Sequence, residues 1–139
     1  MSDQNKGRIW LCISFFIMLS IFSFSNQNSQ ESSSLSLNFV KILLPFLDSE
    51  LAHFLIRKMA HFTIYALLGF SLYRSFSFFH KKSWGLFIVC LAWIIVYAGL
   101  DEFHQLFIDG RSGELRDIFI DSCGGCLGIC LSLWLKKWF

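Results

Sequence analysis

Charge is scarce in this sequence. Asp, Glu, Lys and Arg make up only 16% of its 139 residues, against roughly 25% in an ordinary soluble domain, and Pro45 is the single proline. Hydrophobic residues make up 55% of the chain and aromatic residues 18%. A small domain cannot bury that much apolar surface in a core of its own, because small domains bury the smallest fraction of their surface. The composition therefore excludes a soluble enzyme, a disordered tail and a disulfide-rich secreted module, and it predicts a lipid-facing surface.

Positive and negative residues nearly balance in this sequence. The formal net charge is +2, and the basic residues are too scattered to indicate a nucleic-acid partner. The five cysteines all fall inside apolar runs, which favours small buried residues of membrane helices over disulfides. They are Cys12, Cys90, Cys123, Cys126 and Cys130.

Four apolar segments predict an all-α integral membrane protein with four transmembrane helices, in a single domain over residues 1–139. A spanning helix needs about 20 mostly apolar residues, and the segments are residues 9–25, 57–79, 84–100 and 118–135. The first follows Lys6 and Arg8 as a signal peptide would, but it ends without a small-x-small cleavage site, so an uncleaved signal anchor is favoured. Residues 35–54 are too short and too charged to span, and we expect an interfacial helix or turn there.

The positions of Lys and Arg predict the orientation of these spans. Cytoplasmic segments retain basic residues. With the amino terminus inside, the cytoplasmic side carries seven basic residues and one acidic residue, whereas the outer side carries five basic and nine acidic residues. We therefore expect a multi-pass protein of the cell membrane with both termini in the cytoplasm.

This topology predicts a polar cluster at the outer face. Its members come from the outer ends of three spans and from the turn between the last two: Arg57, Lys58, His61, Tyr65, Asp101, Glu102, Gln105, Arg111, Asp117 and Asp121. An ionisable residue such as Asp121 inside an apolar helix is costly and turns toward a partner, for which Arg111 or Arg57 is expected. Its helix face continues in the small residues Gly124 or Gly125, Gly128 and Ser132, which would let a neighbouring helix approach closely.

The residue types in the cluster fit an anionic ligand. Arginine binds phosphate and carboxylate groups in bidentate fashion, and an imidazole titrates near neutral pH, which makes His61 the best general base or acid. Tyr65 and Gln105 are expected to orient His61. The catalytic candidates are His61, Glu102 and Asp101, and the predicted binding residues are Arg57, Lys58, Tyr65, Gln105, Arg111, Asp117 and Asp121.

Other chemistry receives weaker support from the sequence. A metal held by His61, His104 and Asp101 or Glu102 is a minor alternative, since imidazole and carboxylate suit zinc or manganese. No HxxxH or HExxH pair places two histidines on one turn, so no metal and no other cofactor is predicted. The CxxC spacing of residues 123–126 lacks a second pair and is interpreted as helix packing.

Three ordered motifs carry a family resemblance. Residues 58–65 resemble the Lys-x-x-His-Phe-x-x-Tyr signature of VanZ-like membrane proteins. Residues 101–107 and 110–111 are similar to that family's Asp-Glu-x-x-Gln-x-Phe and Gly-Arg elements, and residues 117–125 resemble its closing Asp-x-x-x-Asn/Asp-x-x-Gly element. Asp121 stands where many members carry Asn. The resemblance covers nearly the whole chain and implies a small bacterial integral membrane protein, of a family named for a member associated with teicoplanin resistance.

These observations lead to one functional expectation and one alternative. The first is a protein that binds or acts on an anionic cell-envelope lipid or surface-polymer precursor at the outer leaflet, by hydrolysis or group transfer if it is an enzyme, with a link to glycopeptide susceptibility. The alternative is a non-catalytic structural or transport-associated membrane protein, whose buried ion-pair network fixes its helix packing. The expected partners are membrane lipid and an anionic lipid-linked ligand, and no nucleic-acid partner is expected. The sequence leaves the oligomeric state open.

Overall fold

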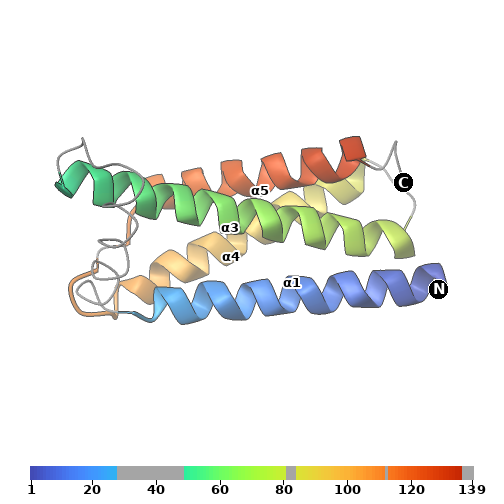
Figure 1. The fold of residues 1–139 in the computed structure, drawn as a ribbon, viewed down its shortest axis with the longest axis horizontal. Helices are drawn as coiled ribbons and strands as arrows, with labels where there is room; N and C mark the ends of the chain where they lie inside the picture. Colours follow the sequence, from blue (N-terminus) through green and yellow to red (C-terminus); the bar gives the residue numbers. More distant parts are fainter. Residues whose placement is uncertain (28–48, 81–83, 112, 136–139) are drawn as a thin grey trace.

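A computed structural model gives four helices in the part of the chain that it describes (Figure 1). The structure describes residues 1–27, 49–80, 84–111 and 113–135, apart from the side chains of residues 49, 50 and 53. The helices are α1 (Asp3–Ser25), α3 (Ser49–Phe79), α4 (Trp84–Gln105) and α5 (Leu115–Leu135). The all-helical prediction is therefore confirmed.

The helix bounds differ from the predicted segments at their polar ends. The Ser2 hydroxyl accepts a hydrogen bond from the Asn5 backbone amide at 3.3 Å and Asp3 lies in the first turn, a favourable start for a helix. α1 therefore begins before the apolar run. α3 begins at Ser49, inside the predicted interfacial segment, whose residues 35–48 lie outside the described residues. α4 continues past Leu100 to Gln105.

Three of the four helices have the length and composition of a membrane span. They are α1, α4 and α5. α3 is the longest, at 31 residues, but it includes Arg57, Lys58 and Arg74 and is not among the helices apolar enough to cross a membrane. Many large apolar side chains face outward, including Phe15, Phe16 and Ile88, as the composition predicts for a lipid-facing surface.

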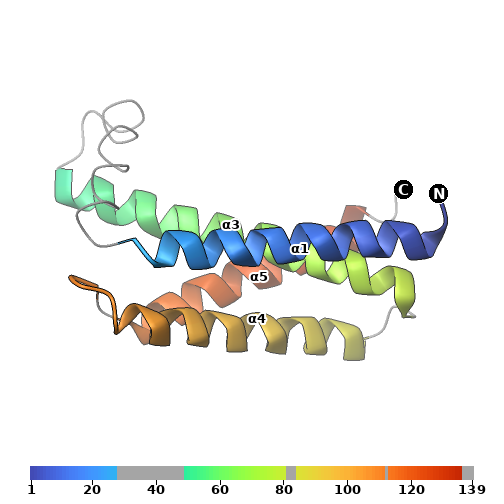
Figure 2. The same cartoon turned by 90° about the horizontal axis from the view of Figure 1, so that it is seen from below.

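The helices form a bundle in which α3 packs mainly against α5 and α1, and α4 packs mainly against α5. Both views show the end of α1, the start of α3, the end of α4 and the start of α5 gathered at one end of the bundle (Figures 1 and 2). The start of α1 and the end of α5 lie at the other end. The polar segments singled out in the sequence therefore meet at one end.

Small residues set the distance between α3 and α5. A Cβ added to Gly124 would lie 2.3 Å from the Phe62 carbonyl oxygen, and a Cβ added to Gly69 would lie 2.1 Å from the Gly125 carbonyl oxygen. Contacts this short occur only where side chains are absent. The predicted small-residue stripe is confirmed, because Gly124, Gly125, Gly128 and Ser132 are all buried.

Hydroxyl groups link α1 to its neighbours. Ser14 donates to the Ser71 hydroxyl at 3.0 Å, and Ser75 donates to the Gly7 carbonyl oxygen at 2.9 Å. Tyr97 of α4 donates to the Met18 carbonyl oxygen at 2.8 Å. These bonds satisfy polar groups inside an apolar bundle.

The prediction that the cysteines are buried is wrong for most of them. Only Cys90 is buried; Cys126 is partly exposed, and Cys12, Cys123 and Cys130 are exposed on the bundle surface. All five are free thiols, as expected. A thiol is apolar enough to lie on a lipid-facing surface, so an apolar run by itself does not show which side of a helix a cysteine occupies.

Candidate functional site

The last turn of α4 supplies two buried carboxylates. Asp101 and Glu102 are 5% and 3% exposed, and Gln105 is buried beside them. Gln105 Nε2 donates to Asp101 Oδ2 at 3.3 Å and to Glu102 Oε1 at 3.4 Å. The Glu114 backbone amide donates to Glu102 Oε2 at 2.9 Å. Gln105 was predicted to orient His61, but in the structure it orients these two carboxylates.

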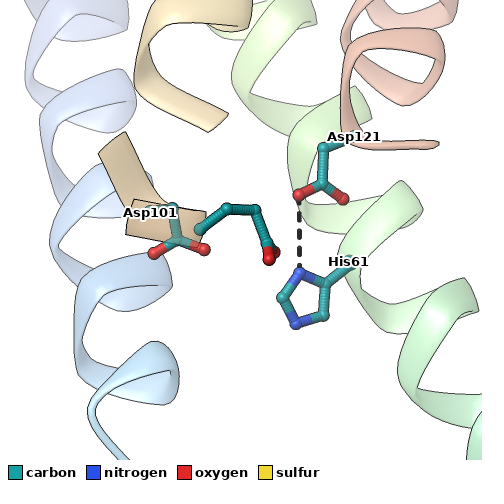
Figure 3. A group of neighbouring side chains, drawn as sticks. His61, Asp101 and Asp121 are labelled. Carbon is teal, nitrogen blue, oxygen red and sulfur yellow. Dashed lines mark ion pairs between the residues drawn. The ribbon is translucent and has the colours of Figure 1, made fainter. Parts of the chain in front are cut away.

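A histidine on α3 faces a carboxylate on α5. His61 Nδ1 lies 3.6 Å from Asp121 Oδ2, an ion-pair distance too long for a hydrogen bond. Figure 3 shows the Asp121 carboxylate above the imidazole ring, with Asp101 to one side. Asp121 is fully buried, and the His61 side chain is 24% exposed. The predicted pairing of Asp121 with Arg111 or Arg57 is therefore replaced by a pairing with His61.

These residues form one compact group, which we call the acid–histidine cluster: His61, Asp101, Glu102 and Asp121. One nitrogen or oxygen atom from each residue lies within 4.8 Å of those from the other three. All three catalytic candidates thus come together, with Asp121 as a fourth member. Three helices contribute to the cluster. His61 belongs to α3, Asp101 and Glu102 lie at the end of α4, and Asp121 lies near the start of α5.

A second charged pair joins α3 to α5 one turn closer to the end of the bundle. Lys58 Nζ contacts both carboxylate oxygens of Asp117. The two side chains are only 14% and 11% exposed. Lys58 Nζ also lies 5.1 Å from the centre of the Phe54 ring. The Lys58 ammonium, predicted to hold a ligand phosphate, is thus engaged by a carboxylate of the protein itself.

The predicted ligand-binding Arg111 ties the loop after α4 to the end of α1. Arg111 Nε donates to the Gln27 carbonyl oxygen at 3.1 Å, and Nη2 donates to that of Phe24 at 3.4 Å. Partial burial lowers the pKa of Arg111 from its usual value, and the positive charge of Arg57 lowers it further. The charge of Arg57 therefore acts on Arg111.

His104 lies apart from the cluster. Its Nε2 donates to Asn26 Oδ1 at 3.1 Å, and its ring stacks on Phe22 with centroids 5.0 Å apart. The metal alternative named His104 as a ligand, but His104 is not among the residues whose potential ligand atoms gather in the cluster. Tyr65 also behaves differently from the prediction: it is fully buried, and its hydroxyl has no hydrogen-bond partner among the described residues. It does not orient His61 through a hydrogen bond.

Sequence reasoning missed two contributors in the loop before α5. They are the Glu114 backbone amide and Gly113, where an added Cβ would lie 2.5 Å from the Glu102 carbonyl oxygen. Gly113 thus lets this loop lie against the end of α4. Neither residue carries a side-chain signal, because one acts through its backbone and the other through the absence of a side chain.

The fold and the site define a class: a helical bundle with membrane-spanning segments and a buried cluster of ionisable side chains at one end. A family model described as VanZ/LLP1 matches residues 10–136. The chain belongs to this family. No curated protein and no solved structure shows a significant match to the sequence.

Proposed function

We propose that the protein crosses the bacterial cell membrane four times, with α3 as the fourth span and both termini in the cytoplasm. Two observations support this topology. The start of α1 and the end of α5 lie at the same end of the bundle (Figure 1), and the basic residues outnumber the acidic residues seven to one on the side assigned to the cytoplasm. The acid–histidine cluster then lies at the outer leaflet.

Reporter fusions test this topology. A fusion after Gly113 is expected to report the outside, and a fusion after Phe139 the cytoplasm. A cytoplasmic signal from the fusion at Gly113 would overturn the orientation and the placement of the cluster at the outer leaflet.

We further propose that the cluster acts on an anionic, lipid-linked phosphate by hydrolysis or group transfer. The observation that carries this proposal is the partly exposed His61 imidazole held beside the buried Asp121 carboxylate. A carboxylate next to one imidazole nitrogen fixes the ring and stabilises its protonated form, leaving the other nitrogen to exchange protons with a substrate. The nearby Arg57 and Arg111 guanidinium groups are suited to attract a phosphate.

The chemistry balances with these groups alone. His61 Nε2 accepts the proton of a water or an alcohol as its oxygen forms a bond to phosphorus. The phosphorus–oxygen bond to the departing alcohol breaks, and the imidazolium returns the proton to that leaving oxygen. Asp121 keeps its negative charge beside the imidazolium throughout the reaction.

The test uses the full chain reconstituted into vesicles that contain either phosphatidylglycerol or a polyprenyl diphosphate. Products are followed by phosphorus NMR and mass spectrometry. We expect turnover by the parent, loss of turnover in His61→Ala, and parental turnover in the matched control His104→Ala, because His104 lies outside the cluster. Equal turnover by parent and His61→Ala would refute the assigned role of His61, and no turnover on either lipid would refute this substrate class.

A specific observation also favours the structural alternative. The Lys58–Asp117 pair bridges α3 and α5 with both side chains mostly buried, as a network that fixes helix packing would do. The two functions differ in how stability and phenotype change together. If the protein is structural, Glu102→Gln and His61→Ala would lower the melting temperature in detergent together with any loss of function. If the cluster is an active site, the same two variants would lose function and keep a melting temperature near that of the parent.

A link to glycopeptide susceptibility is a further part of the proposal and rests on the family resemblance alone. Cells that express the parent are expected to show a different minimal inhibitory concentration of teicoplanin from cells that express His61→Ala at equal membrane levels. Identical values would remove this link and leave the lipid proposal unaffected.

A further inference from the structure

The acid–histidine cluster concentrates negative charge in a place that water barely reaches. Asp101, Glu102 and Asp121 are all buried, and one oxygen from each lies within 4.8 Å of the other two and of a His61 nitrogen. Like charges this close disfavour one another's ionised forms, more strongly where burial lowers the local dielectric. With all three carboxylates ionised, a single imidazolium would leave two negative charges unbalanced.

Two basic side chains near the cluster, those of Lys58 and Arg111, contact other groups. Lys58 binds Asp117, and Arg111 donates to carbonyl oxygens at the end of α1. Over residues 1–27, 49–80, 84–111 and 113–135, His61 is the one basic side chain in ion-pair contact with a carboxylate of the cluster. Among the described residues, direct ion pairs therefore do not balance three ionised carboxylates, and Arg111 and Lys58 act on the cluster only from outside ion-pair contact.

Two fully buried groups at the cluster have no hydrogen-bond partner in the described part of the chain. Both carboxylate oxygens of Asp121 are buried without one, although the group faces His61 (Figure 3). The Tyr65 hydroxyl is likewise buried and without one. Tyr65 follows His61 by one helical turn, and its hydroxyl interacts electrostatically with Asp101 and Asp121. Buried polar groups in native proteins are normally satisfied, so these groups indicate a ligand that carries positive charge.

We propose that the acid–histidine cluster binds a divalent metal cation of the manganese type. A cation bound at about 2.1 to 2.4 Å keeps opposite ligand atoms no more than about 4.2 to 4.8 Å apart, and the four ligand atoms, all within 4.8 Å of one another, meet the upper end of this range. Carboxylates suit Mg²⁺, Ca²⁺ and Mn²⁺, whereas imidazole suits Zn²⁺ and other transition metals. Three carboxylates with one imidazole therefore favour a cation between these groups, for which Mn²⁺ is the best probe.

Neighbouring groups already hold two of the ligands in place. Gln105 Nε2 donates to both Asp101 and Glu102, and the Glu114 backbone amide donates to Glu102 Oε2. Hydrogen bonds of this kind orient metal ligands and raise affinity. Each of these two carboxylates keeps a further acceptor position for a cation, since a carboxylate offers about four.

The experiment measures Mn²⁺ binding directly, without any lipid substrate. The full chain is purified in detergent, treated with EDTA and titrated with Mn²⁺, and free Mn²⁺ is followed by electron paramagnetic resonance. We expect one Mn²⁺ per chain, displaced by Zn²⁺ or Mg²⁺, and a higher melting temperature with the cation bound. If none of the three cations binds at concentrations up to about 1 mM, which covers weak protein sites, the proposal is wrong.

Near-isosteric variants locate the bound ion. Asp121→Asn and Glu102→Gln each remove one charge with little change of shape, and each is expected to weaken Mn²⁺ binding about 10-fold or more. Glu114→Gln is the matched control, because it keeps the backbone amide that binds Glu102 and should bind as the parent does. Parental affinity in both cluster variants would place the ion elsewhere and overturn the site. If one variant does not fold, as judged by gel filtration, the other decides.

This inference does not rest on the group-transfer proposal. An imidazole that binds a cation through one nitrogen carries its proton on the other, so His61 acts as general base only in the cation-free cluster, and the two proposals can fail separately. Turnover that persists after EDTA treatment, with no cation bound at any concentration tested, would overturn the cation site and leave group transfer standing. Stoichiometric Mn²⁺ binding with no turnover on either lipid would support the cation site and overturn group transfer.

Discussion

Replacing Gly128 by alanine tests the closest approach between α3 and α5. A Cβ added at Gly128 would lie 1.9 Å from the Ala66 carbonyl oxygen and 2.8 Å from the Phe70 backbone nitrogen. Ordinary contact begins at 3.4 Å, so the gap would have to open by about 1.5 Å, the difference between 3.4 and 1.9 Å. The obstructing atoms belong to the backbone, so no change of rotamer can relieve the clash.

The expected cost follows from this geometry. Overpacking a tight interface costs about 1 to 3 kcal/mol, and we expect Gly128→Ala to lose about 3 kcal/mol because the helices themselves must separate. The same separation would lengthen the 3.6 Å contact between His61 and Asp121, since α3 and α5 carry these two residues. Gly128→Ala should therefore impair the site as well as the fold.

Gly99→Ala is the matched control for this prediction. Gly99 also lies inside a helix, α4, but an added Cβ there meets no atom within 4 Å. Alanine is favoured over glycine in a helix by about 1 kcal/mol, so Gly99→Ala should be at least as stable as the parent. Stability is measured by thermal unfolding in detergent with gel-filtration detection. A Gly128→Ala protein that melts at or above Gly99→Ala would refute the close-packing argument.

Three further predictions address the charged groups. Lys58→Met leaves Asp117 buried without its partner and should cost about 3 to 5 kcal/mol; a denaturation midpoint equal to that of the parent would contradict this burial. Asp121→Asn should accumulate in membranes near the parental level and Asp121→Leu less, because the amide keeps polar contacts; immunoblots with equal amounts of both would show that the carboxylate has no polar partner. Arg111→Lys loses the guanidinium hydrogen bonds to the end of α1 and should lower the free energy of unfolding by about 0.5 to 1.5 kcal/mol. Arg116→Lys, at an exposed position, should be neutral, and equal melting temperatures for the two variants would refute a stabilising role of the Arg111 hydrogen bonds.

The sequence by itself determined that the chain folds into helices and which ionisable residues gather at one end of them. Long apolar runs in a chain with so little charge can only be hidden by lipid and by one another, so four helical segments follow from composition and length. The expensive ionisable residues of those segments have to face inward. For this reason His61, Asp101, Glu102 and Asp121 could be predicted as members of a larger polar cluster before any contact between helices was known.

Only the tertiary structure decided which groups meet. The pairing of Asp121 with His61, of Lys58 with Asp117, and of Arg111 with the end of α1 depends on the rotation and height of each helix relative to its neighbours. Those quantities are set by backbone-to-backbone contacts at glycines such as Gly124 and Gly128, between residues far apart in the chain. Local patterns fix which face of a helix is polar, but a charge on that face has several candidate partners of opposite sign, and packing chooses among them.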